Sequence, residues 1–447
     1  MSSLEPVELV DRIWARDPTV WTGGDEAHWL GWLDEPAHML ERLDEVKGLD
    51  RGAFESIVLL GMGGSSLAPE VLRRTFGIDD FYVLDTTHPD AIRTLEDAID
   101  VEGSLFVAAS KSGTTPETRC QLDYFLPRAG GFGAITDPGT ELEQFAKEHD
   151  FAFVINGEPT IGGRYSALSP FGMAPAALMG LNVEELLERA EAMAEWCRLG
   201  DDNPGLAFGL QLGEEWYDGR DKVCIDATPG GFGLWAEQLV AESTGKHGKG
   251  LVPAPGEDPK GPDRQHGRVR LDDPYDVGAE FFRWEFATAV AGSMLAINPF
   301  NQPDVQAAKD RTAAILERVK NGIDPAAESS VEELLADAEP PQYVAIQAFI
   351  DPAREEELDP LVERARETGC VVTKGLGPRY LHSTGQLHKG GPNTVRALQV
   401  VDDFGEELEI PGRDFGFRRL IAAQAAGDLD ALKERGRRVC RVRLDDL

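Results

Sequence analysis

The 447-residue sequence predicts an α/β protein built from parallel sheets that are covered by helices. Three observations support this fold class. Short apolar runs alternate with amphipathic helical patterns, turns rich in glycine or hydroxyl groups join each run to the next helix, and the alternation occurs in two blocks separated by a helical stretch at 183–199. Such strand–helix–strand units form right-handed crossovers in parallel sheets. The length also suits more than one domain.

The first block begins at residue 56, after a segment of short helical patterns containing four tryptophans. The run SIVLLGMGGSS predicts a strand and a turn, and LAPEVLRRTFG predicts a helix that ends at Gly77. Strands are next expected in FYVLDTT and SLFVAASKSG, with helices near 90–99 and at 116–125. The run GGFGAITDPGTELEQFAKEHD predicts a strand, a turn and a helix.

The second block repeats this design without a visible sequence repeat. Strands are expected in DKVCIDATP, YVAIQAFID and CVVTKG, and helices in FGLWAEQLVAESTG and PLVERARETG. Residues 250–276 are rich in Gly, Pro and charge, which predicts an irregular surface excursion. The chain is therefore divided into an N-terminal helical segment (1–55), two α/β domains (56–200 and 201–400) and a C-terminal segment packing on them (401–447).

Composition excludes several classes of partner. The chain has 79 acidic and 44 basic residues, a net charge of −35, which argues against nucleic acid or an anionic membrane as partner.

No apolar run approaches the ~20 residues that span a bilayer, and the N-terminus lacks a secretory signal pattern. Five scattered cysteines without a CxxC pair suggest neither a disulfide framework nor a thiolate metal site. We therefore expect a cytoplasmic protein.

Two strand-to-helix turns have the composition of anion-binding sites. The turn GMGGSS (61–66) is glycine-rich, although such a sequence is a simple tight turn as often as a ligand site. The second turn, SKSGTTPET (110–118), places four hydroxyls and a lysine ahead of Pro116. One helix cap needs only one hydroxyl, so we favour a phosphate site over an N-cap.

Two charged residues, Arg164 and Glu242, are candidates for catalysis. Arg164, in GGRYS, could stabilise an anionic intermediate, but the pattern alone favours a surface arginine paired with a carboxylate. Glu242 shares a helix face with Leu234 and Gln238 and is either solvated, which the pattern alone favours, or a general base.

Two histidines occur together in LHSTGQLHKGG, at positions 382 and 388. Their spacing of six does not suit a helical metal site, so an acid/base histidine is favoured over a metal ligand. A structural histidine remains the alternative for either residue. No metal or organic cofactor is predicted.

Taken together, these segments resemble the glucose-6-phosphate isomerase family, especially the isomerase half of fused transaldolase/glucose-6-phosphate isomerases. Five motifs occur in the family's order, namely GMGGSS, SKSGTTPET, GGRYS, AESTGK and LHSTGQLHKGG. The resemblance runs from about residue 56 to the C-terminus, and no transaldolase portion is present. It implies two sugar-isomerase (SIS) domains of flavodoxin-like type with the active site between them.

The resemblance also implies a role for each motif residue. Glu242 would be the base that moves a proton between C2 and C1 through a cis-enediol, Arg164 would stabilise the enediolate, and His382 would assist ring opening. The phosphate would be held by Ser110, Ser112, Thr115 and Thr118, and the substrate pocket would be lined by Gly64, Ser65, Lys111 and Gly163.

The C-terminal tail departs from the family pattern. Long family members have a lysine after a Gln-Trp-Gly motif that takes part in ring opening, whereas no lysine occurs here between Lys389 and Lys433. Arg418 or Arg419 could supply charge but could not readily donate a proton. What replaces the lysine is not evident from the sequence.

The predicted function is interconversion of glucose 6-phosphate and fructose 6-phosphate, a step of glycolysis and gluconeogenesis. The alternatives are a bifunctional phosphoglucose/phosphomannose isomerase and a non-catalytic sugar-phosphate-binding regulator. The resemblance further implies a homodimer with shared active sites, in which His382 reaches the site of the neighbouring subunit.

Overall fold

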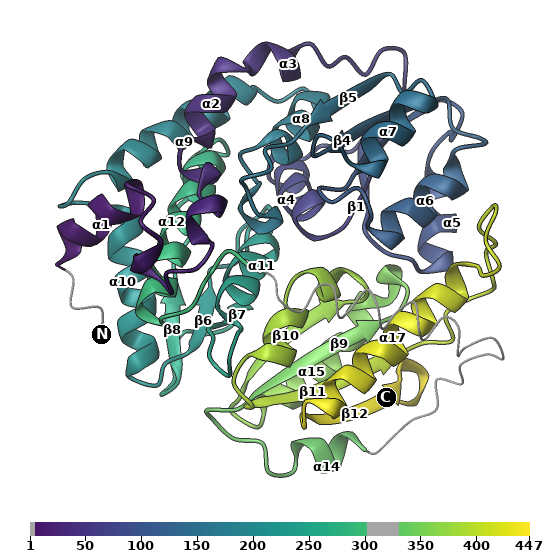
Figure 1. Ribbon diagram of the computed structural model, residues 1–447. Coiled ribbons are helices and arrows are strands. Elements are labelled where there is room, and N and C mark those ends of the chain that lie inside the picture. Colours follow the sequence, from purple (N-terminus) through teal and green to yellow (C-terminus); the bar gives the residue numbers. More distant parts are fainter. Residues whose placement is uncertain (1–4, 302–329) are drawn as a thin grey trace.

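The computed structural model describes residues 5–301 and 330–447 (Figure 1). The N-terminal segment forms the helices α1 (Pro6–Trp14), α2 (Glu35–Glu41) and α3 (Leu43–Lys47), joined by short 3₁₀ turns. Its tryptophans anchor it to the rest of the protein: Trp14 stacks on Phe282, and the buried Trp32 contacts Tyr165. Burial of such large rings fixes this segment on the molecule.

The first block forms one parallel sheet of five strands in the order β2-β1-β3-β4-β5, which confirms the α/β fold class. The strands are β1 (Ser56–Gly61), β2 (Phe81–Leu84), β3 (Ser104–Ala109), β4 (Gly131–Thr136) and β5 (Phe153–Asn156). The intervening helices are α4 (Leu67–Phe76), α5 (Pro89–Ala98), α6 (Pro116–Phe125) and α7 (Glu141–Glu148). Only β5 was not expected, because its four residues form a short edge strand.

Local chemistry explains where these elements start and stop. The helix α4 ends because Gly77 adopts the left-handed conformation, with φ of 65°, which glycine tolerates best. The helix α6 begins with Pro116, whose fixed φ suits the first helical position and whose missing N–H has no partner there in any case. Both boundaries are as predicted.

A layer of helices follows the first sheet. It contains α8 (Pro170–Leu178), α9 (Val183–Cys197), α10 (Pro204–Tyr217) and α12 (Asp276–Met294). Nearly every residue of α12 is buried, because α9, α10 and the N-terminal tryptophans cover it (Figure 1). The helix α12 therefore lies in the core, where its buried Arg283 and Glu280 form an ion pair of 2.6 Å.

The second block contains two parallel sheets. One has the order β7-β6-β8 and the other β10-β9-β11-β12. Their strands are β6 (Lys222–Ile225), β7 (Val252–Pro255), β8 (Arg264–Gly267), β9 (Tyr343–Phe349), β10 (Val371–Leu376), β11 (Val395–Val401) and β12 (Arg438–Arg443). The described helices are α11 (Gly233–Thr244), α14 (Val331–Leu335), α15 (Asp359–Arg366), α16 (Gly385–Gly390) and α17 (Phe417–Glu434).

Several details of the second block differ from the sequence prediction, and one is that the strand β11 was not expected. Residues 250–276 are not wholly irregular, because both β7 and β8 pair with β6 there. The tail after residue 401 does more than pack on the domains, since β12 hydrogen-bonds to β11. The boundaries proposed at residues 200 and 400 stay a prediction.

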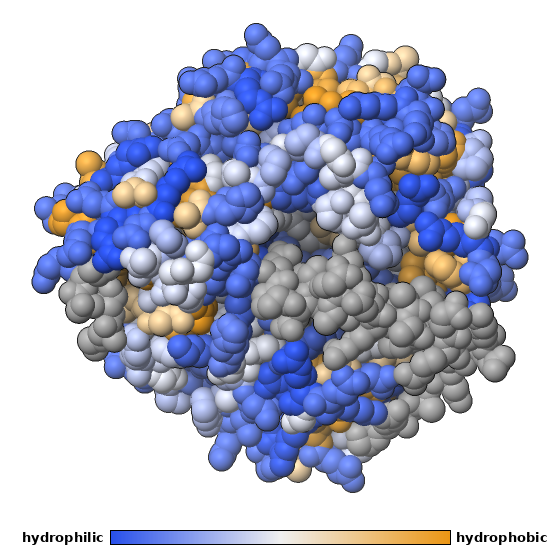
Figure 2. Space-filling model, in the orientation of Figure 1, coloured by the Kyte–Doolittle hydropathy of each residue, from blue (hydrophilic) through white to orange (hydrophobic). Residues whose placement is uncertain are grey.

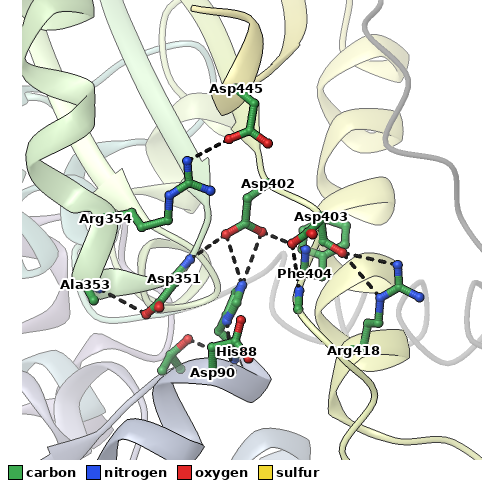
Figure 3. Close-up of polar contacts among 12 residues, drawn as sticks. His88, Asp90, Asp351, Ala353, Arg354, Asp402, Asp403, Phe404, Arg418 and Asp445 are labelled. Carbon is green, nitrogen blue, oxygen red and sulfur yellow. Dashed lines mark hydrogen bonds and ion pairs between the residues drawn. The ribbon is translucent and has the colours of Figure 1, made fainter.

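A polar seam joins the first sheet to the second block. The loop after β2 supplies Asp85, which accepts two hydrogen bonds from Arg379, and Thr87, which donates to Gln424. In the same loop the buried His88 lies 3.2 Å from both oxygens of Asp402, at the end of β11 (Figure 3). The loop therefore contacts three elements of the second block and fixes their position relative to the first sheet.

The face of the molecule in Figure 2 is mostly hydrophilic, with a hollow near its middle, close to where α11 and β1 lie in Figure 1.

In the described part of the chain, no helix combines the length and apolar character needed to cross a membrane.

Candidate active site

The two anion-binding motifs lie next to each other at one edge of the first sheet. The turn 61–66 follows β1 and the turn 110–115 follows β3, and these two parallel strands are hydrogen-bonded neighbours. The strand order reverses between them, because β2 lies beyond β1 while β4 and β5 lie beyond β3. Open α/β sheets bind ligands at the carboxyl ends of strands at such a switch point.

The hydroxyls of the second turn are grouped in pairs. The Oγ of Ser110 lies 2.8 Å from Oγ1 of Thr115, and the Oγ of Ser112 lies 3.1 Å from Oγ1 of Thr114. Thr115 occupies the N-cap position of α6, yet its side chain makes no capping hydrogen bond. The structure therefore favours the phosphate-site interpretation over the capping alternative.

Thr118, in the first turn of α6, is buried, and its Oγ1 has no hydrogen-bond partner among the residues that the structure describes. Burying a hydroxyl without a partner is unfavourable. The hydroxyl is thus able to bond a bound anion, as the resemblance implies.

Lys111 connects the second turn to the end of β4. Its Nζ donates to both oxygens of Asp137 at 2.8 Å and to the carbonyl oxygen of Glu158 at 2.7 Å. An ammonium group has three donors, and these contacts use all three. A role for Lys111 in lining the substrate pocket stays a prediction.

Close backbone packing brings the turn after β1 against the segment that contains Arg164. A Cβ at Gly64 would lie 2.0 Å from the carbonyl oxygen of Gly163, so this contact requires glycine. Ser65, in the 3₁₀ turn Gly63–Ser65, is buried at the same contact. The GMGGSS and GGRYS motifs therefore form one structural unit.

Arg164 and Glu242 are both buried, which corrects two expectations. Arg164 is fully inaccessible, not a surface arginine, and Glu242 is 6% exposed, not solvated. Nε of Arg164 donates to Oγ of Ser243 at 2.9 Å, and its Nη2 donates to the carbonyl oxygen of Pro299 at 2.6 Å. The sequence could not show this burial because the covering residues come from distant parts of the chain.

The remaining guanidinium nitrogen faces the carboxylate. Nη1 of Arg164 lies 3.7 Å from Oε2 of Glu242, and it has no hydrogen-bond partner in the described part of the chain. Burial raises the pKa of Glu242 to about 7, although the charges of Arg164, His382 and Lys246 oppose the shift. A carboxyl group with a pKa near neutrality suits general base catalysis.

His382 lies in the same site as Glu242 of its own chain. Its Nε2 is 2.9 Å from Oε1 of Glu117, and its carbonyl oxygen accepts a hydrogen bond of 2.8 Å from Gln238. Gln238 also donates to Glu242 at 3.3 Å, which confirms their predicted common helix face. In this structure the turn after β10 packs on α11 of the same chain, so His382 lies in the site of its own chain. The expectation that His382 serves the site of a neighbouring subunit stays a prediction.

Two site residues were not identified from the sequence. Glu117 is buried beside the hydroxyl loop and accepts hydrogen bonds from His382 and, at 2.7 Å, from Gln424 on α17. A signal for Glu117 existed, since it follows Pro116 within the phosphate motif. No sequence signal marked Gln424, because only the folding of the chain brings the C-terminal tail next to Glu117.

The two arginines considered as substitutes for the family lysine have other contacts. Arg418 donates to the carbonyl oxygen of Asp403, and Arg419 to that of Asp414 (Figure 3 shows Arg418). Gln424 is instead the residue of α17 that enters the site. Within residues 5–301 and 330–447 there is no cluster of three or more His, Cys, Asp or Glu arranged to hold a metal ion.

His388 is a structural histidine. It is buried, its Nδ1 lies 3.0 Å from the hydroxyl of Tyr343, and burial lowers its pKa to about 3. A histidine that stays neutral across the physiological range is not suited to proton exchange there.

Known proteins that are similar to this chain carry the names of the family that its motifs resemble. Residues 37–219 match the phosphoglucose isomerase family model. A glucose-6-phosphate isomerase of Cyanothece sp. is 32% identical over 219 residues, covering 44% of this chain and 41% of the relative. A probable glucose-6-phosphate isomerase of Methanococcus maripaludis is 29% identical over 281 residues, covering 57% and 62%. The chain thus spans less than two thirds of these relatives' lengths.

A solved structure shows the same fold. The glucose-6-phosphate isomerase of Chlamydia trachomatis superposes with a TM-score of 0.53 at 19% identity, covering 70% of this chain and 78% of the other. The predicted class of parallel sheets flanked by helices is thereby confirmed. The match of residues 37–219 to the phosphoglucose isomerase family model confirms the resemblance found in the motifs.

Proposed function

We propose that this protein interconverts glucose 6-phosphate and fructose 6-phosphate through a cis-enediol intermediate. The observation that most supports the proposal is the buried Glu242, whose pKa is raised to about 7 beside an arginine nitrogen at 3.7 Å. A partly desolvated carboxylate can remove the C2 proton and return it to C1. The guanidinium then offsets the negative charge of the enediolate.

Nη1 of Arg164, which has no hydrogen-bond partner within residues 5–301 and 330–447, is the nitrogen that faces Glu242. The other donors of Arg164 bond to Ser243, Pro299 and Asn301, which hold the side chain rigidly. A donor that is fixed before the reaction loses little free energy to reorganisation. Arg164 therefore suits an oxyanion that forms near Glu242.

Ring opening is assigned to His382 with Glu117 as its orienting partner. The carboxylate fixes the imidazole through the 2.9 Å contact, and Gln424 fixes the carboxylate. An imidazole can exchange a proton with the ring oxygen near neutral pH. This assignment needs no lysine of the kind that follows a Gln-Trp-Gly motif in long family members. The lack of a lysine between Lys389 and Lys433 is the main departure from the family pattern.

The phosphate is assigned to the loop after β3. Ser110, Ser112, Thr115 and Thr118 would donate to its oxygens, and the N-terminus of α6 adds a favourable dipole. The phosphate does not react, so its binding serves to position the sugar carbons near Glu242.

A coupled assay of the purified protein tests the proposal. With fructose 6-phosphate as substrate, glucose 6-phosphate should be produced and oxidised by an NADP-dependent dehydrogenase. Binding of phosphosugar without turnover would instead support the regulator, and equal turnover of mannose 6-phosphate would support the bifunctional enzyme. No observation in the structure favours either alternative.

Homodimer formation and a cytoplasmic location complete the proposal. The five cysteines are all free and buried, which suits a reducing compartment. Because Glu242 and His382 lie in one chain, each subunit of such a dimer would hold a complete site.

A further inference from the structure

The chain just after α12 contacts two buried cations through its backbone. Nη2 of Arg164 donates to the carbonyl oxygens of Pro299 and Asn301, at 2.6 and 3.0 Å. Lys246, just after the end of α11, donates from Nζ to the carbonyl oxygens of Asn298 and Asn301, both at 2.7 Å. The carbonyl oxygen of Asn301 thus accepts a hydrogen bond from each cation, which couples the positions of the two side chains.

This segment, residues 298–301, is here named the carbonyl clamp, and its own shape is fixed by polar contacts and packing. Oδ1 of Asn298 accepts hydrogen bonds from the N–H groups of Phe300 and Asn301, at 2.9 and 3.2 Å. Such a side-chain contact stabilises a turn of the backbone. Phe300 also packs edge-on against Trp21 of the N-terminal segment, with ring centroids 5.0 Å apart. The carbonyl groups therefore face the cations from a fixed backbone.

Lys246 also acts on the proposed base. It is buried and lies four residues after Glu242 in the chain. Burial raises the pKa of Glu242 to about 7, and the charges of Arg164, His382 and Lys246 each oppose the rise. A cation that favours the ionised carboxyl group increases the fraction of active base near neutral pH.

We propose that Lys246 is a positioning residue of the reaction, which acts on Arg164 through the carbonyl clamp and on Glu242 through its charge. The inference rests on the proposed function, because it gives Lys246 a role in the same isomerisation. A donor whose orientation is fixed in advance needs little reorganisation when negative charge develops beside it. The inference assigns Lys246 no contact with the substrate.

Lys246→Met removes the charge and the donors while it keeps a long side chain in the interior. The rate of fructose 6-phosphate isomerisation is measured across pH. kcat should fall about 10- to 10²-fold, because Arg164 is no longer held in place, whereas KM should change less than about twofold, because the phosphate loop is untouched. The acid limb, where kcat falls as pH is lowered, should move to higher pH because the pKa of Glu242 rises when a nearby cation is lost.

Two variants serve as matched controls. Lys246→Arg keeps the positive charge, so its acid limb should stay at the pH of the parent. Lys249→Met removes an equal charge close by, but Nζ of Lys249 donates to the carbonyl oxygen of Leu295 at 2.7 Å, outside the clamp. Its kcat and acid limb should match those of the parent within about twofold. A shift common to both lysines would indicate a general charge effect.

Asn298→Ala tests the carbonyl clamp without a change of charge. It removes the acceptor that shapes the turn, so kcat should fall while KM and the acid limb stay unchanged. Circular dichroism and gel filtration check that each variant folds. If Lys246→Met does not fold, Asn298→Ala and Lys246→Arg still decide whether the clamp and the charge have the proposed roles.

A titration followed by ¹³C NMR of the glutamate carboxyl groups repeats the charge test without turnover, with Glu242→Gln identifying the signal of Glu242. If the parent does not isomerise fructose 6-phosphate, the proposed function fails, while this titration still decides whether Lys246 acts on Glu242. The inference is overturned if Lys246→Met leaves the titration of Glu242 and kcat unchanged, if Lys249→Met changes them equally, or if Asn298→Ala leaves kcat at the parent value.

Discussion

Replacing Glu242 by Gln separates the catalytic role of this residue from its effect on stability. The change keeps the size of the side chain and removes the proton acceptor. Loss of a positioned general base slows turnover by about 10²- to 10⁴-fold. Substrate binding should persist, because the phosphate loop and Arg164 are untouched.

The same substitution should change how stability depends on pH. In the parent protein Glu242 has a pKa of about 7 when folded, against an ordinary value of 4.5. Below pH 4.5 the Glu242 carboxyl is mostly protonated in both states and makes its full contribution to the free energy of unfolding. As pH rises from 4.5 towards 7 this contribution declines, because the carboxyl ionises in the unfolded chain but not yet in the folded protein. A shift of this size corresponds to about 3 kcal/mol. The free energy of unfolding of Glu242→Gln, minus that of the parent, should therefore rise by about 3 kcal/mol between pH 4.5 and 8.

Glu237→Gln is the matched control. Glu237 lies on the same helix, is also buried, and has a pKa raised to about 8 by burial, but it lies outside the site. Both variants should gain stability relative to the parent as pH rises, as measured by urea unfolding at each pH. Only Glu242→Gln should lose isomerisation and exchange of the C2 proton with solvent. If Glu242→Gln still exchanges that proton at the parent rate, the assignment of the base is refuted.

Three further predictions follow from the site. Ser110→Ala or Thr115→Ala should raise KM about tenfold with little change in kcat, since each hydroxyl bonds a group that does not react; an effect on kcat alone would contradict the phosphate role. Co-refolding inactive Glu242→Gln with inactive His382→Ala should give an inactive mixture, because both residues belong to one site; recovery of about a quarter of the parent activity would indicate sites shared between subunits. EDTA should leave turnover unchanged, because Arg164 supplies the charge stabilisation; activity lost and then restored by a divalent ion would disprove this.

Much of the fold could be predicted because its signals are local. The apolar run before GMGGSS predicted β1, and Gly77 and Pro116 marked helix boundaries that the structure confirms. The errors occurred where long-range pairing decides the structure. The residues of β7 and β8 carry turn-forming Gly and Pro, yet they form strands because β6 lies between them.

The site was predictable to the extent that motifs define it. The residue types of Glu242, Arg164 and His382 suggested the chemistry, but burial could not be seen in the sequence, and local pattern alone favoured solvated roles for the first two. The contacts of Glu117 with His382 and Gln424 join positions 265 and 307 residues apart along the chain. No local pattern encodes such pairings.

The polar seam explains how the two blocks of the chain produce one site. The phosphate loop and Glu117 belong to the first sheet, whereas Glu242 and His382 belong to the second block. Their relative position depends on the loop after β2, where Arg379 is held by Asp85 only three residues before His382. Because Asp85 is buried, removal of Arg379 would leave an uncompensated carboxylate in the interior. A displacement of about 1 Å at a reacting group can reduce the rate about 10²-fold, so we expect contacts that do not touch the substrate to help set the rate of the proposed reaction.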